Sequence, residues 1–211
     1  MSDSGVINDQ QIRDFVKSNP DYYVKEFARI NNSTRFVFSL NWAAFFLGTL
    51  WFGIRNIWNW ALAFLLIETF AVVQVVRGLF GNISADAYKK IDQIQSTIDF
   101  RQKQLQAAIE SNSDKVDVFK RTIKSLEDSI AGYAAEAQRV EEMGFWIAVF
   151  GIMLFLAMRL FQAVMANAIL EKRFSEWLSD RSVRSGMRPA DVVLTTGFAF
   201  TVMLLSTIHY S

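Results

Sequence analysis

The chain has 211 residues, of which 52% are hydrophobic and 14% aromatic, more than an ordinary soluble domain carries. Its formal net charge of +1 gives no bulk attraction for nucleic acid. Because the chain contains no cysteine, disulfides, thiolate metal sites and a cysteine nucleophile are excluded. The hydrophobic residues fall into four blocks, at residues 36–54, 57–76, 145–166 and 190–208. We therefore predict an all-α integral membrane protein.

Residues 1–35 carry apolar side chains at helical spacing on both sides of Asn19 and Pro20. Proline suits the first turn of a helix, and Asn19 can cap it. The stretch has neither the apolar core nor the cleavage site of a signal peptide. We expect amphipathic cytoplasmic helices that lie on the membrane surface or against the helical bundle.

The first hydrophobic block, residues 36–54, contains Asn41 and two glycines, and it lies between Arg35 and Arg55. If this block spanned the membrane, one of these arginines would oppose the positive-inside rule. We therefore favour a re-entrant or interfacial segment here and leave a span as the alternative.

The second block, residues 57–76, is the best candidate for a span. Its length matches the ~30 Å hydrocarbon core, Trp58 and Trp60 suit the interface, and Arg77 closes the far end. Residues 36–83 are thus predicted to form one membrane unit with a single span.

From residue 84 to residue 142 the chain is polar and its apolar residues repeat every seven positions. The first series, interrupted only by the polar Arg101, consists of Ala87, Ile91, Ile94, Ile98, Leu105 and Ala108. After turn-forming residues at 111–114, the second series consists of Val116, Phe119, Ile123, Leu126, Ile130, Tyr133, Ala137 and Val140. The pattern predicts an extramembrane antiparallel coiled-coil hairpin of two helices, each of about 27 residues and ~40 Å.

Residues 143–211 are predicted to hold two further membrane helices joined by a basic cytoplasmic loop. The helix of the third block should continue through residues 167–178, because no glycine or proline stops it. Gly186 and Pro189 then break the chain before the last block.

The orientation follows from the basic residues near the membrane. With three spans, the cytoplasm would hold Arg55, four basic residues of the N-terminal region, and Lys172, Arg173, Arg181, Arg184 and Arg188. With four spans the last five would lie outside. We favour three spans in the bacterial inner membrane, with the hairpin in the periplasm.

Two charged residues lie inside apolar blocks, Glu68 and Arg159. Either charge alone in hydrocarbon would cost at least ~3 kcal/mol, so each needs a partner. In the three-span arrangement they lie on antiparallel helices at depths of ~16 and ~12 Å, and could meet. A buried ion pair that sets helix register is one interpretation. A proton or ion pathway is the other, although only Gln74, Gln162 and Asn167 lie nearby.

The sequence contains no recognisable arrangement of catalytic residues. His209 is the only histidine, and there is neither a Ser-His-Asp arrangement nor a glycine-rich phosphate loop. We therefore predict no catalytic site, metal or cofactor.

Small residues around Ala163 could let another helix pack closely, either one of a partner subunit or one of this chain.

Part of the sequence resembles an uncharacterised family of small bacterial membrane proteins. Its hallmark is a paired-tyrosine element, followed by a Phe-Asn-Trp-Ala-Ala-Phe-Phe segment, a tryptophan and an arginine. Here these features correspond to Tyr22 and Tyr23, the segment that includes Asn41 and Trp42, then Trp51 and Arg55. The likeness covers about residues 15–60, with Leu40 in place of the usual phenylalanine and Gly48-Thr49 where Gly-Pro is common.

A second stretch, residues 166–186, is similar to the membrane leader of some choline and betaine ABC importer permeases. This resemblance implies a non-enzymatic accessory or scaffold subunit of a larger membrane complex, with a permease and a solute-binding protein as partners. A self-assembling channel or pore, hence a homo-oligomer, is the alternative, with the first block as its re-entrant element.

Overall fold

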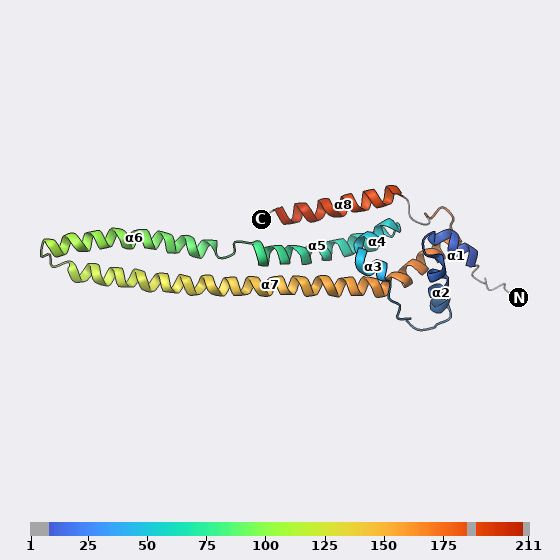
Figure 1. The fold of residues 1–211 in the computed structure, drawn as a ribbon, viewed down its shortest axis with the longest axis horizontal. Coiled ribbons are helices and arrows are strands. Elements are labelled where there is room, and N and C mark those ends of the chain that lie inside the picture. Colours follow the sequence, from blue (N-terminus) through green and yellow to red (C-terminus); the bar gives the residue numbers. More distant parts are fainter. Residues whose placement is uncertain (1–8, 185–188, 209–211) are drawn as a thin grey trace. The chain divides into compact units, whose positions relative to one another are not determined.

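The computed structural model describes residues 9–184 and 189–208, and these form helices and connecting loops without a β-strand (Figure 1). Two compact units divide the chain: one holds the residues up to Val73 and those from Phe150, and the other is Gln74–Val149. The helices are α1 (Asp9–Val16), α2 (Pro20–Asn31), α3 (Trp42–Leu47), α4 (Thr49–Ile54), α5 (Trp58–Phe80), α6 (Ala85–Glu110), α7 (Val116–Ser179) and α8 (Pro189–Thr207).

Three of the described helices are long and apolar enough to cross a membrane, namely α5, α7 and α8. This confirms the all-α prediction and the presence of three such helices. The first hydrophobic block forms no candidate span, because α3 and α4 have six residues each. A six-residue helix is only about 9 Å long, well short of the ~30 Å hydrocarbon core.

In the first unit, the N-terminal helices pack on the C-terminal part of α7. Phe15 and Phe27 are buried, and their ring centroids lie 5.4 and 5.5 Å from that of Phe174. The helix α2 begins at Pro20, as the sequence predicts, but Asn19 makes no side-chain cap. The backbone of Asn19 instead lies in the left-handed region, with φ of 50°. The amphipathic faces of α1 and α2 are therefore covered by the chain itself.

The helix α8 packs against α4 in the same unit, where Thr195 lies beside Gly53. Its remaining surface is apolar and exposed, with Val193, Phe200 and Leu205 each about two-thirds or more accessible. Large apolar side chains are also exposed along α5 and the apolar part of α7. Such surfaces are typical of helices that face lipid.

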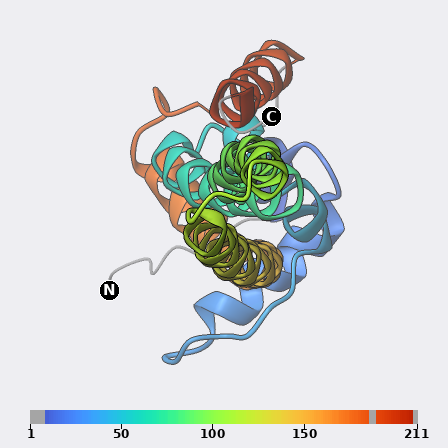
Figure 2. The same ribbon diagram turned by 90° about the vertical axis from the view of Figure 1, so that its left-hand side faces the viewer.

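In the second unit, α6 and the first part of α7 run side by side in opposite directions (Figures 1 and 2). Glu141 accepts hydrogen bonds from Ser84 and Tyr88, each at 3.0 Å, and the ammonium of Lys90 lies 4.9 Å from the ring centroid of Tyr133. Every apolar position of the predicted seven-residue repeat is buried or half-buried, whereas most residues between them are exposed. These contacts join α6 to α7 within one chain.

The second helix of the hairpin does not end before the third hydrophobic block. The helix α7 is continuous for 64 residues, from Val116 to Ser179. Gly144, at the junction, lies within it because a single glycine lowers helix stability by only about 1 kcal/mol. Gly78 of α5 faces Gly144 and Ala148 so closely that a side chain at position 78 would overlap the backbone of α7.

Candidate functional site

The centre of the first unit is a broken helix. The helices α3 and α4 meet at Gly48, whose combination of a φ of +56° with a ψ of −130° is readily adopted only by glycine. A side chain at position 48 would also overlap the guanidinium of Arg159. At the start of α3, the side chain of Asn41 accepts a 3.0 Å hydrogen bond from the N–H of Ala44. Asn41 thus caps α3, and Gly48 has the backbone conformation that ends it.

The structure brings Glu68 of α5 and Arg159 of α7 together at this break. Arg159 Nε lies 3.4 Å from Glu68 Oε1, and Arg159 Nη2 lies 3.5 Å from Glu68 Oε2. Gln162 Nε2 donates a 2.7 Å hydrogen bond to Glu68 Oε1. The side chain of Glu68 is 1% exposed and that of Arg159 14%. Such a buried pair is costly to break, because the remaining charge would lack its partner.

Each charge also binds the helix end that suits its sign. Arg159 Nη1 donates a 3.1 Å hydrogen bond to the carbonyl of Phe46, near the end of α3. The N–H of Thr49, the first residue of α4, points to Glu68 Oε1 at 3.4 Å. Helix C-termini favour cations and N-termini favour anions. The ion pair therefore supplies partners for backbone groups that the break leaves without intrahelical bonds.

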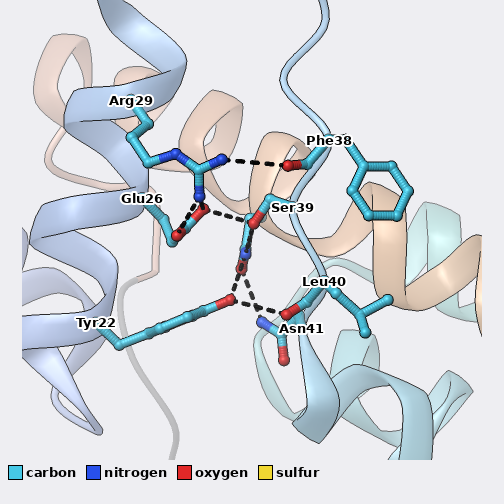
Figure 3. Close-up of polar contacts among 8 residues, drawn as sticks. Tyr22, Glu26, Arg29, Phe38, Ser39, Leu40 and Asn41 are labelled. Carbon is cyan, nitrogen blue, oxygen red and sulfur yellow. Dashed lines mark hydrogen bonds and ion pairs between the residues drawn. The ribbon is translucent and has the colours of Figure 1, made fainter.

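A buried polar network holds the start of α3 (Figure 3). Asn41 Nδ2 donates to Asn167 Oδ1 at 2.8 Å. Asn167 Nδ2 in turn donates to the hydroxyls of Tyr22 and Ser39, each at 2.6 Å. Ser39 donates to Glu26 at 2.5 Å. The network thus ties the N-terminal helices to α7 through the motif residue Asn41.

The paired tyrosines differ in role. Burial raises the pKa of the Tyr22 hydroxyl, which donates to the carbonyl of Leu40 at 3.3 Å. The hydroxyl of Tyr23 instead lies 3.3 Å from Asn41 Nδ2 and 3.4 Å from Arg55 Nη2. Because Asn41 precedes α3 and Arg55 follows α4, Tyr23 joins the two ends of the broken helix.

Arg55 is buried, and within the described part of the chain it forms no salt bridge. It donates to the carbonyl of Val16 at 3.1 Å and to the hydroxyl of Ser18 at 2.7 Å. Its guanidinium also lies over the rings of Tyr23 and Trp51, at 5.1 and 5.5 Å from their centroids. Burial lowers the pKa of Arg55. These contacts offset part of the desolvation of the charge.

The four motif residues therefore have different environments. Asn41, Trp51 and Arg55 are buried, at 3%, 2% and 6% exposure, whereas Trp42 is 60% exposed. Trp42 stacks on Phe46, which is also exposed, with ring centroids 6.1 Å apart. Three motif residues are thus part of the protein interior, and the fourth, Trp42, lies on the surface with other exposed aromatic side chains.

The sequence placed Gln162 and Asn167 near the ion pair but did not predict their hydrogen bonds; both side chains are fully buried. They share one face of α7 with Ala163 and Ala166, and this face is covered within the chain, since the N–H of Asn41 bonds the carbonyl of Ala163 at 2.9 Å. Polar side chains inside an apolar block are the signal, because a buried amide needs hydrogen-bond partners.

The described residues contain no group of three or more metal-binding side chains, and His209 and Arg188 lie outside them. The polar groups of the site mostly bond one another, so their evident role is to hold the broken helix in place. Comparisons with family models, curated proteins and solved structures find no match for this chain.

Proposed function

We propose that this protein is a non-enzymatic scaffold of the bacterial inner membrane, which binds a larger complex through its α6–α7 hairpin. The observation that carries the proposal is the distribution of exposed side chains. Helices α5 and α8 and the apolar part of α7 expose many large apolar residues, whereas the exposed residues of the hairpin are mostly polar, with Phe100, Ile109 and Val118 among the exceptions. One region suits lipid, and the other suits an aqueous partner.

In the proposed orientation α5, α7 and α8 span the membrane and the α3–α4 pair re-enters it. The basic residues of the N-terminal region and of the loop after α7 lie in the cytoplasm, and the hairpin lies in the periplasm. Re-entrant backbone requires protein or water around it, and the bonds from Arg159 and Glu68 to the ends of α3 and α4 support this arrangement.

The partner we propose is an ABC-type importer of quaternary-amine osmolytes such as choline or betaine. This choice rests on the resemblance of residues 166–186 to a permease leader and of the motif segment to small membrane proteins. A non-enzymatic role is supported by the site, where Glu68, Asn41 and Asn167 are engaged by protein groups.

The test is purification of the full chain from its native host in mild detergent, with quantitative mass spectrometry of the associated permease, ATPase and solute-binding protein. A variant that reverses three exposed hairpin lysines, Lys103→Glu, Lys120→Glu and Lys124→Glu, leaves the seam intact. We expect it to fold and insert normally but to lose the complex. Deletion of residues 91–133, bridged by a short flexible linker, should do the same.

A self-assembling channel is the alternative, and it makes the opposite prediction. The purified protein alone would then give steady ion conductance in liposomes, and the hairpin variants would conduct equally. The ion pair at the break between α3 and α4 favours the scaffold, since it bonds the carbonyl of Phe46 and the N–H of Thr49, which are therefore not available to line a pore. Conductance by the isolated chain, together with full yield of the complex in the hairpin variants, would overturn the proposal.

A further inference from the structure

A pocket of about 420 Å³ lies where α5 begins and the apolar part of α7 ends. Its lining includes Trp58, Asn59, Trp60, Lys172, Arg173 and Glu176. The volume falls in the range of small-molecule sites, which is roughly 300–1,000 Å³. None of these six residues takes part in the broken-helix site, so the pocket needs a separate explanation.

The lining is positively charged. Arg173 Nη1 donates to Glu176 Oε2 at 3.0 Å, so these two charges offset each other. The remaining cation of the lining is Lys172, which is exposed. The Nε of Arg173 is buried and makes no hydrogen bond in the structure. The N-terminus of α5, a helix of 23 residues, adds its positive dipole end beside Trp58 and Asn59. The pocket therefore suits an anion.

The position of the pocket selects the kind of anion. The helix α5 is about 34 Å long at 1.5 Å per residue, close to the thickness of a bilayer core, so its start lies at a membrane surface if it spans. Trp58 and Trp60 fit this position, because tryptophan is enriched at the membrane–water interface. Along α7, the apolar stretch gives way to charged residues at Glu171. Both helices thus change from apolar to polar at the same pocket.

We propose that this pocket binds the phosphate of an anionic phospholipid headgroup, such as that of phosphatidylglycerol. Lys172 and Arg173 neutralise the phosphate, Asn59 offers a hydrogen-bonding amide for the headgroup, and the tryptophan rings pack beside the glycerol. The inference rests on the membrane anchoring within the proposed function but not on recognition of a partner. Failure of the hairpin experiments would leave it intact.

The test measures lipid binding by the purified full chain in a neutral detergent, with native mass spectrometry and thermal stabilisation as readouts. The ligands are short-chain phosphatidylglycerol, short-chain phosphatidylcholine and glycerol 3-phosphate. The variant is Lys172→Gln with Arg173→Gln. The matched control is Lys120→Gln with Arg121→Gln, an identical pair on the same helix that is exposed in the hairpin.

We expect phosphatidylglycerol to bind more tightly than phosphatidylcholine, and the Lys172 and Arg173 variant to lose about fivefold in affinity per cation, roughly 25-fold in all. The control pair should bind like the natural chain. Asn59→Asp separates binding from folding. A carboxylate in the first turn favours the helix, so thermal stability without lipid should hold or rise, while phosphatidylglycerol affinity falls.

Two outcomes would overturn the inference. The first is equal affinity for the two lipids, together with equal affinities of the pocket variant and its hairpin control. This result would show that the pocket has no preference for anionic headgroups. Binding of glycerol 3-phosphate as tight as that of phosphatidylglycerol would instead assign the pocket to a soluble phosphate compound, and would exclude a lipid as its specific occupant.

Discussion

Arg159 and Glu68 face each other across the break between α3 and α4, with Nε 3.4 Å from Oε1, and each also contacts the end of one of these short helices. The pair therefore has two roles, since it joins α5 to α7 and provides hydrogen-bond partners for backbone groups where the helix is interrupted. Its effect on stability should depend on the positions of the two charges as well as on their signs.

Removing one member of this pair should strongly destabilise the first unit. Glu68→Gln or Arg159→Gln leaves a buried charge without its partner, at an expected cost of about 3–5 kcal/mol. The double variant should lose less than the sum of the two. The measurement is the free energy of unfolding in detergent, in a double-mutant cycle with the exposed Arg139→Gln as control.

Exchange of the two charges tests the contacts with the helix ends. Glu68→Arg with Arg159→Glu keeps an ion pair but points a carboxylate at the carbonyl of Phe46 and a cation at the N–H of Thr49. We expect this exchange to be less stable than the double glutamine variant. A fully stable exchange variant would show that the backbone contacts contribute nothing.

Gly48→Ala should disrupt the break between the short helices. The alanine would adopt a strained positive φ, which costs roughly 1–3 kcal/mol, and its Cβ would displace the guanidinium of Arg159. Gly132→Ala is the matched control, because position 132 lies in α7 with nothing within 4 Å of an added Cβ. This control should hold or raise thermal stability, since alanine favours a helix by up to ~1 kcal/mol over glycine. Equal melting temperatures for the two variants would contradict the prediction.

Two substitutions at Asn41 should separate its roles as helix cap and as network member. Asn41→Ser keeps a good capping side chain but loses the bonds from Nδ2 to Asn167 and Tyr23, whereas Asn41→Ala loses both. We expect the alanine variant to be less stable by a further ~0.5–2 kcal/mol, in thermal or denaturant unfolding. If the two variants unfold alike, capping by Asn41 is not significant for stability.

The proposed orientation is testable because the chain has no cysteine of its own. Single cysteines at Asn112, in the hairpin turn, and at Arg181, after α7, should differ in labelling by an impermeant maleimide on intact spheroplasts. We expect position 112 to react and position 181 to react only after lysis. Both positions are exposed, so burial does not explain a difference. Equal labelling before lysis would contradict the three-span arrangement.

The sequence by itself determined the helical class and the three long apolar helices, because hydropathy and period are local properties of the chain. It also predicted which residues of the hairpin are least exposed, since a seven-residue repeat specifies which side chains share a face. The partner of Glu68 could be inferred as well, from its depth in the second block and that of Arg159 in the third.

Only the tertiary structure decided which groups these residues bond. Tyr23 bonds both Asn41 and Arg55, and Arg159 bonds the carbonyl of Phe46, 113 residues earlier in the chain. No local pattern encodes such contacts, because they depend on how α3 and α4 fold back against α7. The break at Gly48 illustrates the difference. A glycine in an apolar block is compatible with a continuous helix, and only the charges that meet its backbone show why the helix stops there.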